Sequence, residues 1–376
     1  MTQEEKELLG FLDFFKKIPD HRIERRKLHR VEEILLVTFC GIIAGCDGWE
    51  DIEFFGKTKI DFFKKHLPFD NGIPSDDTLR RFFRALDPKV FESCFTEWVK
   101  SFQIDLKSKV VALDGKTERH SFDGENNPLH LVSAFASEVG LVLGQEKVAD
   151  KSNEIKAIPK LLDILDLENA IVTIDVMGCQ HAIADKILDK GADYLLALKG
   201  NQSQLHDDVK LAFEKRYKKG KYISCEEVDG GHGRVEIRNC AVTKDIGWLT
   251  ERHPQWKGLC SIVEINSTRI IKKISTNEKR YYISSLEPDP NNMLTAIRQH
   301  WGIENRLHWI LDVSFGADQS RIRKGNAPQN IAVIRKCALN LLQQIKKDMP
   351  RASIRRLRKL AGWDEDFLNT VLSIKF

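Results

Sequence analysis

Short apolar runs and amphipathic segments alternate through the middle of the chain, between residues 106 and 212. Five of the runs have the length and β-branched content of buried strands, and the segments between them include three with helical periodicity. The expected order is strand-strand-strand-helix-strand-helix-strand-helix. Three meandering strands, followed by strands that alternate with helices, predict a mixed sheet covered by helices. The strands are expected at 109–114, 130–137, 141–148, 170–175 and 194–198, and the helices at 158–167, 180–190 and 205–217.

The segments on either side of this region have different patterns. Residues 1–105 and 291–376 read as helical, and the first helix of the later segment is expected at 293–313. Residues 220–290 are rich in strand formers, which predicts a β-rich insertion packed beside the sheet. Its strands are expected at 235–242, 259–265, 270–275 and 279–284. We divide the chain into an N-terminal helical domain, residues 1–105, and an α/β domain, residues 106–376.

Composition limits the class of protein. The 376 residues are 42% hydrophobic and 30% charged, which excludes a disordered chain, collagen and a disulfide scaffold. The eight cysteines include no C-x-x-C pair, so zinc-knuckle spacing is absent and reduced cytosolic thiols are expected. The first ten residues are too polar for a signal peptide, and the run 34–44 is shorter than the roughly 20 residues of a membrane span. We expect a cytoplasmic protein with no membrane partner.

Two acids follow apolar strands and are the first candidates for chemistry. Asp114 and Asp175 each end an expected core strand, where α/β sheets place ligand and metal sites. Read singly, each Asp is also explained as a turn or helix cap. Glu304 is the third candidate, because His300, Glu304 and His308 share one face of the expected helix, although a solvated polar stripe has the same spacing. Three carboxylates from two strand ends and a helix would suit a site for two Mg²⁺ or Mn²⁺ ions.

Several motifs give the chain a family resemblance. It resembles the DDE transposases of bacterial insertion sequences, in the branch that includes the H-repeat-associated proteins. The strings that carry the resemblance are VALDGK at 111–116, TIDVMGCQ at 173–180, LALKGNQ at 196–202, HWGIEN at 300–305, HWILDV at 308–313 and RIRKGNA at 321–327, with IPDHR at 18–22 and GCDGW at 45–49 in the N-terminal domain. The similarity covers nearly the whole chain.

The resemblance implies a fold and a site. The fold would be a ribonuclease-H-like α/β core, a mixed five-stranded sheet flanked by helices, with the β-rich insertion before the helix of the catalytic Glu. Asp114, Asp175 and Glu304 would be the catalytic triad that binds the metal ions. One departure concerns the superfamily signature of Tyr, Arg, Glu and Lys around the catalytic Glu. The equivalent positions here are Ile297, His300, Glu304 and Leu311, so the phosphate contacts of that signature are not carried over.

Cations in several places are candidates for DNA contacts. Lys116, Lys199, Arg321 and Arg323 are placed to neutralise backbone phosphates, although each is also explained as an ordinary surface cation. Trp301 could stack on an unpaired base, or pack in the core. Local basic stripes in the N-terminal domain are Arg80, Arg81 and Arg84, on a helix that begins near 76, and Arg22, Arg25 and Arg26.

Charge is distributed unevenly along the chain. The net charge of +4 merely permits a nucleic-acid partner, but residues 316–376 hold 13 Lys and Arg against 5 Asp and Glu, whereas residues 1–105 hold 17 against 20. Part of the DNA path is therefore expected along the C-terminal segment.

The resemblance and the charge lead to one principal hypothesis. The chain would bind the terminal inverted repeats of its own element in double-stranded DNA and cleave the ends with two Mg²⁺ ions. It would then transfer the 3′-hydroxyl ends to target DNA, as a homodimer at the nucleoid of a bacterial cytoplasm. The alternatives are an inactive or repurposed DNA-binding remnant and a ribonuclease-H-like nuclease that acts on other nucleic acid.

Overall fold

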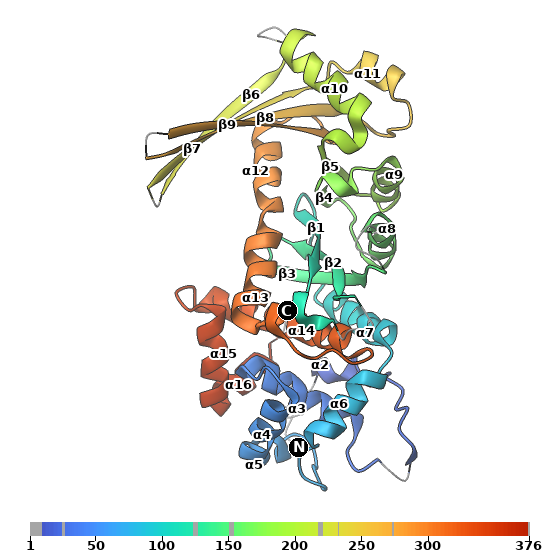
Figure 1. Cartoon of the computed structure of the whole chain (residues 1–376), viewed down its shortest axis with the longest axis vertical. Helices are drawn as coiled ribbons and strands as arrows, with labels where there is room; N and C mark the ends of the chain where they lie inside the picture. Colours follow the sequence, from blue (N-terminus) through green and yellow to red (C-terminus); the bar gives the residue numbers. More distant parts are fainter. Residues whose placement is uncertain are drawn as a thin grey trace.

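The computed structural model describes residues 10–24, 27–122, 127–149, 154–216, 221–231, 233–272 and 274–374. Its N-terminal part is helical, as expected, and lies at the bottom of the molecule in Figure 1. Phenylalanine and tryptophan rings fill its interior; Phe15, for example, contacts both Phe39 and Phe91. The helices are α2 (Gly10–Asp13), α3 (Val31–Ala44), α4 (Trp49–Thr58), α5 (Ile60–Lys64), α6 (Asp76–Ala85) and α7 (Pro88–Lys100). Arg25 and Arg26 of the second basic stripe lie outside the described residues.

A mixed sheet of nine strands organises the rest of the chain, in the order β3-β2-β1-β4-β5-β9-β8-β7-β6. β1 is antiparallel to β2 and parallel to β4, β2 is antiparallel to β3, and β4 is parallel to β5. The five strands expected from the apolar runs are therefore confirmed as strands. They are β1 (Val110–Thr117), β2 (His130–Ala136), β3 (Leu141–Lys147), β4 (Ile171–Ile174) and β5 (Asp193–Leu198).

The β-rich insertion lengthens this sheet, which corrects the expectation of a five-stranded sheet with an insertion packed beside it. β9 pairs antiparallel with β5, so the insertion continues the hydrogen-bonded ladder (Figure 1). The strand expected at 279–284 is confirmed as part of β9, but the one expected at 270–275 is wrong, because the hairpin of β8 and β9 turns within it. The insertion comprises β6 (Ile223–Gly231), β7 (Arg234–Thr243), α11 (Gly247–Arg252), β8 (Ser261–Ile271) and β9 (Ile274–Ser284).

Helices cover both faces of the first five strands. On one face α8 and α9 pack against the sheet, as the close approach of Leu161 of α8 to Gly144 of β3 illustrates. On the other face Met293, Leu294 and Ile297 of α12 contact the side chains of Val110, Ile171 and Leu195. The helices on these two faces are α8 (Glu154–Ile164), α9 (His181–Asp189) and α12 (Pro290–His300), whereas α10 (Ser203–Leu211) contacts β9 and α13 (Trp309–Phe315) packs on α15.

Helix α14 (Ala327–Asp348) joins the sheet to the N-terminal helices, because it packs against β3 and also against α3, α6 and α7. The side chain of Asn340, which is fully buried, accepts a hydrogen bond from Val142 N (2.8 Å) and donates one to Val142 O (2.9 Å). One side-chain amide thus satisfies both main-chain polar groups of Val142, a residue of the edge strand β3. Two helices follow, α15 (Ile354–Trp363) and α16 (Glu365–Leu372), and α15 packs on α3.

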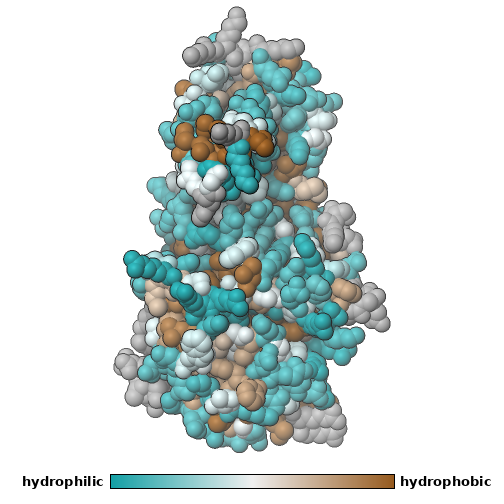
Figure 2. Space-filling view, turned by 60° about the vertical axis from the view of Figure 1, so that its left-hand side comes forward, coloured by the Kyte–Doolittle hydropathy of each residue, from teal (hydrophilic) through white to brown (hydrophobic). Residues whose placement is uncertain are grey.

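Across the described ranges, no helix is both long and apolar enough to cross a membrane. All eight cysteines are free thiols, as expected from their spacing. The face brought forward in Figure 2 is largely hydrophilic, with hydrophobic residues confined to small areas.

Candidate active site

Asp114 lies where β1 leaves the buried part of the sheet. Val110 to Leu113 are buried, and Asp114 Oδ1 accepts a hydrogen bond from Gly115 N at 2.8 Å. Burial raises the pKa of Asp114 to about 7, and the negative charges of Asp175, Glu154 and Glu304 act in the same direction. The carboxylates therefore lie close enough to repel one another, and a bound cation would relieve that repulsion.

Asp175 directly follows the buried strand β4 and caps a short 3₁₀ turn, Val176–Gly178, where its Oδ1 accepts from Met177 N at 3.0 Å. The interpretation of Asp175 as a helix cap is therefore confirmed. Burial also raises the pKa of Asp175, and the charge of Glu154 raises it further. Because β1 and β4 are parallel neighbours, Asp114 and Asp175 emerge at the same edge of the sheet.

Glu304 lies on the helical segment formed by α12, the residues after it and α13 (290–315), which we call the rod. The rod is not the continuous α-helix expected over 293–313. α12 ends at His300, and after Trp301 the rod continues through a π-helical segment, Glu304–His308, in which Trp309 N–H donates to Glu304 O. Single π-helical turns occur frequently at functional sites. Glu304 is exposed, and its charge contributes to the raised pKa of Asp114.

Two histidines of the rod contact the strands. His308 Nδ1 lies 3.4 Å from Asp114 Oδ2, and His300 Nδ1 lies 3.0 Å from the hydroxyl of Thr173 on β4. Burial lowers the pKa of His308 to about 3 and that of His300 to about 4. Both rings are therefore neutral near pH 7. The expected shared face of His300, Glu304 and His308 is altered by the π-helical turn, which leaves Glu304 exposed between two half-buried rings.

Glu154 and His130 were not among the residues selected from the sequence. Glu154 is the first residue of α8, and its Oε1 lies 2.6 Å from His130 Nε2. The two residues are 24 positions apart, and Glu154 follows a polar stretch with no periodic signal. Among the sequence features, the Gly after Asp114 could have indicated close approach by another group.

The expected DNA-binding residues lie in different surroundings. Lys116 is half-buried and its Nζ pairs with Asp312 Oδ2 at 2.7 Å. Lys199 is exposed, and its loop is held against the segment after Asp175, because Asn201 Nδ2 donates to Val176 O at 2.6 Å. Trp301 is 38% exposed, with the Arg280 guanidinium 5.1 Å from its ring centroid, so it is not a core residue.

Arg321 and Arg323 line a groove of about 570 Å³ between the N-terminal helices and the segment after the rod. Trp49 and Arg80 contribute from the N-terminal side, and Lys324 from the other. Arg321 is exposed, whereas Arg323 Nε donates to His120 O at 2.8 Å and its guanidinium stacks over Phe122.

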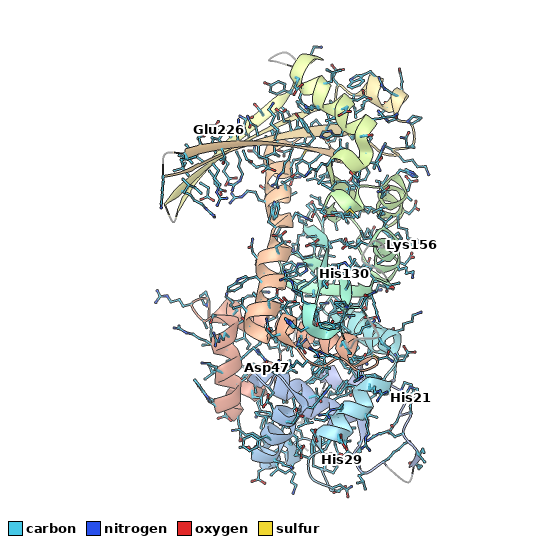
Figure 3. All side chains as sticks on the ribbon, in the orientation of Figure 1. His21, His29, Asp47, His130, Lys156 and Glu226 are labelled. Carbon is cyan, nitrogen blue, oxygen red and sulfur yellow. The ribbon has the colours of Figure 1, made fainter. Side chains whose placement is uncertain are left out.

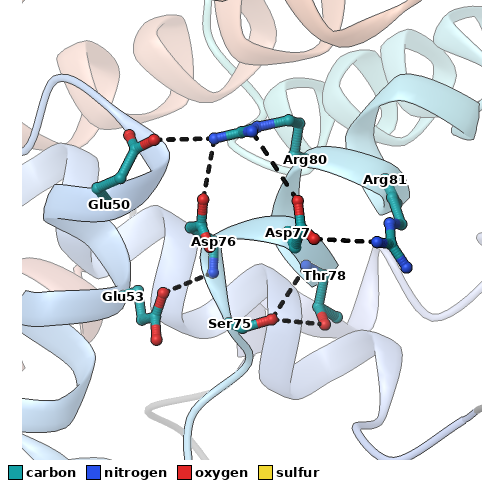
Figure 4. Close-up of polar contacts among 8 residues, drawn as sticks. All are labelled: Glu50, Glu53, Ser75, Asp76, Asp77, Thr78, Arg80 and Arg81. Carbon is teal, nitrogen blue, oxygen red and sulfur yellow. Dashed lines mark hydrogen bonds and ion pairs between the residues drawn. The ribbon is translucent and has the colours of Figure 1, made fainter.

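The basic stripe on α6 is largely neutralised by neighbouring acids (Figure 4). Arg80 pairs with Glu50 at 2.8 Å and with Asp76 at 2.9 Å, and Arg81 pairs with Asp77 at 2.9 Å. Ser75 accepts from Thr78 N and begins the helix where the sequence predicts it. These contacts give Arg80 and Arg81 a structural role in tying α6 to α4 and to its own first turn.

Two family models match the chain. A model described as DDE_Tnp_1-associated matches residues 12–99, and one described as Transposase DDE domain matches residues 85–341. The second alone covers more than half of the chain. The chain belongs to the DDE transposases.

The relatives place this transposase in the H-repeat-associated branch. It is 43% identical over 376 residues to "Putative transposase YncI" of Escherichia coli O157:H7, covering 97% of this chain and 94% of that protein. It is 40% identical over 374 residues to "H repeat-associated putative transposase YhhI" of E. coli K12, covering 98% of each. It is also 44% identical over 75 residues, 20% of this chain, to "Inactive transposase YbfQ" of the same strain, covering 89% of that protein.

Among solved structures, the transposase is similar to one titled "Cryo-EM structure of piggyBac transposase synaptic complex with hairpin DNA (SNHP)", with 10% identity and a TM-score of 0.43. The match covers 98% of this chain and 79% of the other. A likeness at that level carries no argument about this chain.

The chemistry of the site fits a divalent cation, although no three acidic, His or Cys side chains of the described ranges converge into a preformed ion cage. The donors are carboxylate oxygens, which Mg²⁺ and Mn²⁺ prefer. His308, whose Nδ1 lies 3.4 Å from Asp114 Oδ2, has a buried Nε2 with no hydrogen-bond partner in the part of the chain that the structure describes. An unpaired buried nitrogen beside these carboxylates is compatible with a further group at the site.

Proposed function

We propose that this transposase binds the terminal inverted repeats of its insertion sequence, cleaves each end and transfers the 3′-hydroxyl ends to target DNA. The observation that carries the proposal is the gathering of acidic side chains around Asp114 in a chain of the DDE family: burial raises the pKa of Asp114 to about 7, and the charges of Asp175 and Glu304 act in the same direction. Carboxylates held together in this way are strained without a cation and are suited to bind one.

The strand order supports a ribonuclease-H-like core within the larger sheet. The first five strands lie in the order β3-β2-β1-β4-β5. Among them, β2 runs opposite to the other four. Asp114 lies within β1, directly after its buried part, Asp175 directly follows β4, and Glu304 comes from the rod that covers these strands. We also keep the division into residues 1–105 and 106–376 as a proposal, with α14 packed on both parts.

Asp114, Asp175 and Glu304 would hold two Mg²⁺ ions, or Mn²⁺ in their place. When bound, such ions activate the attacking oxygen and stabilise the leaving oxygen of a phosphodiester. The protein's own contribution is to hold three carboxylates at one edge of a rigid sheet, with Asp175 oriented by Met177 N and Asp114 by Gly115 N. The neutral His308 excludes water from one side of Asp114 without adding a positive charge.

DNA contacts are proposed for cations near this edge and along the groove. Lys199 lies on the loop tied to the segment after Asp175, and Arg321 and Arg323 line the groove beside the N-terminal helices. Trp301 presents part of its ring to solvent three residues before Glu304, which suits stacking on a base. Lys116 is the weakest of these candidates, because Asp312 already neutralises it.

The assembly and location follow from the reaction. Two element ends must be cut and joined together, so we propose a homodimer on DNA. Bacterial DNA lies in the cytoplasm, so the proposed reaction places the protein there, at the nucleoid.

The test is a cleavage assay on double-stranded DNA that carries the repeats flanking the gene. We expect cleavage at the repeat ends with Mg²⁺ and none with a chelator, and loss of cleavage in Asp114→Asn and Glu304→Gln with DNA binding kept. Glu138→Gln, on the exposed turn after β2, is the matched control and should cleave as the unmodified protein does. Cleavage by Asp114→Asn would refute the assignment, and cleavage without preference for the repeats would favour a general nuclease.

A further inference from the structure

A fourth carboxylate occupies space that exists only because residue 115 is glycine. A Cβ atom on Gly115 would lie 2.3 Å from Glu154 Oε1 and 3.0 Å from His130 Nε2, distances at which the groups would collide. Gly115 directly follows Asp114, so the missing side chain opens the strand to Glu154 beside the proposed catalytic residue. Glu154 reaches Gly115 from α8, and His308 of the rod contacts the neighbouring Asp114.

The position of Glu154 is set by a chain of hydrogen bonds from the sheet. The hydroxyl of Thr117 lies 2.7 Å from His130 Nδ1, and His130 Nε2 lies 2.6 Å from Glu154 Oε1. Thr117 and His130 are opposite each other in the β1–β2 pair, so strand pairing itself holds the ring in place. An ionised carboxylate only accepts, so His130 Nε2 donates to Glu154 Oε1.

The orientation of Glu154 is inward. His130 lies near the middle of the molecule in Figure 3, whereas Lys156, two residues after Glu154 on α8, lies on the outer side. The Glu154 side chain is only 18% exposed, in contrast to the exposed Lys156. Its charge reaches both aspartates, because after burial itself it is among the causes that raise the pKa of Asp114 and of Asp175.

We propose that Glu154, oriented by His130, is a further carboxylate ligand of the divalent-cation site formed by Asp114, Asp175 and Glu304. His130 engages one carboxylate oxygen, Oε1, and the second is available to a hard cation such as Mg²⁺ or Mn²⁺. A carboxylate that is held by an imidazole follows a common rule of metal sites, in which outer partners orient the ligands. This inference rests on the proposed function, because it presupposes that the three acids bind a cation.

The test measures binding of Mn²⁺ alone to the full chain, without DNA, by electron paramagnetic resonance. Replacing Glu154 by Gln keeps its shape and removes its charge, and should weaken Mn²⁺ binding about tenfold or more. His130→Ala leaves the carboxylate without its partner and should weaken binding by a similar factor. Glu138→Gln is the matched control and should bind as the unmodified chain does. The thermal unfolding midpoint without metal shows that each variant is folded, and His130→Ala decides the matter if Glu154→Gln does not fold.

Asp114→Asn separates this inference from the proposed function. If Asp114→Asn and Glu154→Gln both lose affinity, both proposals are supported. If Asp114→Asn loses Mn²⁺ and both Glu154→Gln and His130→Ala keep it, the role of Glu154 is refuted while the three-acid site stands. If Asp114→Asn also keeps full affinity, the cation site itself is wrong and both proposals fall.

Discussion

His308 Nδ1 lies 3.4 Å from Asp114 Oδ2, which brings an imidazole from the π-helical turn into contact with a carboxylate of β1. The contact joins two segments almost 200 residues apart. The two groups respond to burial in opposite directions, because burial raises the pKa of Asp114 to about 7 and lowers that of His308 to about 3. Near neutral pH the pair is a neutral ring beside a carboxyl group that is only partly ionised.

Asp114 should lower the stability of the metal-free protein as the pH rises. Its pKa is about 7 in the folded protein and about 4 in the unfolded chain, so between these values the folded state binds more protons and stability falls with increasing pH. The free energy of unfolding of Asp114→Asn, relative to that of the unmodified protein, should therefore increase by about 2–4 kcal/mol between pH 4 and pH 7. Urea unfolding in chelator, at several pH values, measures the gain, and Mg²⁺ should reduce it. A difference that does not change with pH would contradict the raised pKa.

His308 should lower the stability of the folded protein at acid pH. The unfolded chain binds a proton on this ring below about pH 6.5, whereas the folded protein binds it only near pH 3, so stability is lost as the pH falls through this range. His308→Gln should lose less stability between pH 6.5 and 4 than the unmodified protein does. Thermal unfolding across this range measures the effect. The exposed His21→Gln is the control, and equal slopes for His308→Gln and the unmodified protein would rule out a buried neutral ring.

A methyl group at position 115 should be costly because of Glu154. The Cβ of Gly115→Ala would lie 2.3 Å from Glu154 Oε1, so the carboxylate must move and give up its hydrogen bond to His130, which costs about 1–3 kcal/mol. The cost should shrink when Glu154→Ala is also present, because the shorter side chain leaves the space free. A double-mutant cycle by chemical unfolding measures this coupling. Gly230→Ala, where a Cβ meets nothing within 4 Å, is the control, and additive effects of the two changes would disprove the contact.

Arg321 and Arg81 should differ in DNA binding although both are exposed. Arg81 is paired with Asp77, whereas no ion pair within the described ranges involves Arg321, which lines the groove. Arg321→Ala should weaken binding and reduce the slope of log affinity against log salt by about one, as expected for a lost phosphate contact. Arg81→Ala should change the slope little. Fluorescence anisotropy at several salt concentrations tests both, and equal slopes for Arg321→Ala and the unmodified protein would remove Arg321 from the DNA path.

Asn340 should contribute strongly to stability from inside α14. Its amide pairs with both polar groups of Val142, and Asn340→Ala would leave a buried N–H and C=O without partners. Each such group costs about 1–3 kcal/mol, so a total loss of about 2–6 kcal/mol is expected. Thermal or urea unfolding measures the loss. Asn291→Ala, an exposed change on α12, should have little effect, and a comparable loss in the two variants would show that the buried amide is not the cause.

The sequence was informative where apolar residues are contiguous. Runs such as 110–113 and 171–174 predicted the core strands, and the acids directly after them gave two candidate site residues. The register of the insertion was harder, because most of β9 up to Arg280 is exposed and carries no inward-outward pattern.

Contacts between distant residues left no signal in the sequence. No pattern near Glu154 predicts its contact with His130, and none near Arg80 predicts that Glu50 neutralises the arginine. The π-helical turn was also hidden, since residues 304–308 look helical with either hydrogen-bonding pattern. These features depend on tertiary packing, which overrides local preference.

The joint between β5 and β9 has a consequence for how such a protein can diversify. Main-chain hydrogen bonds run from Leu195 to Leu198 across to Tyr281 through Ser284, so the hairpins share one continuous ladder with the strands that carry the two aspartates. A residue pair added at the far turn of β8 and β9 would lengthen their reach and preserve which side chains face which way. Such growth would leave the carboxylates where they are. The outer hairpins can therefore change in length without moving β1 and β4, the strands that hold the two aspartates.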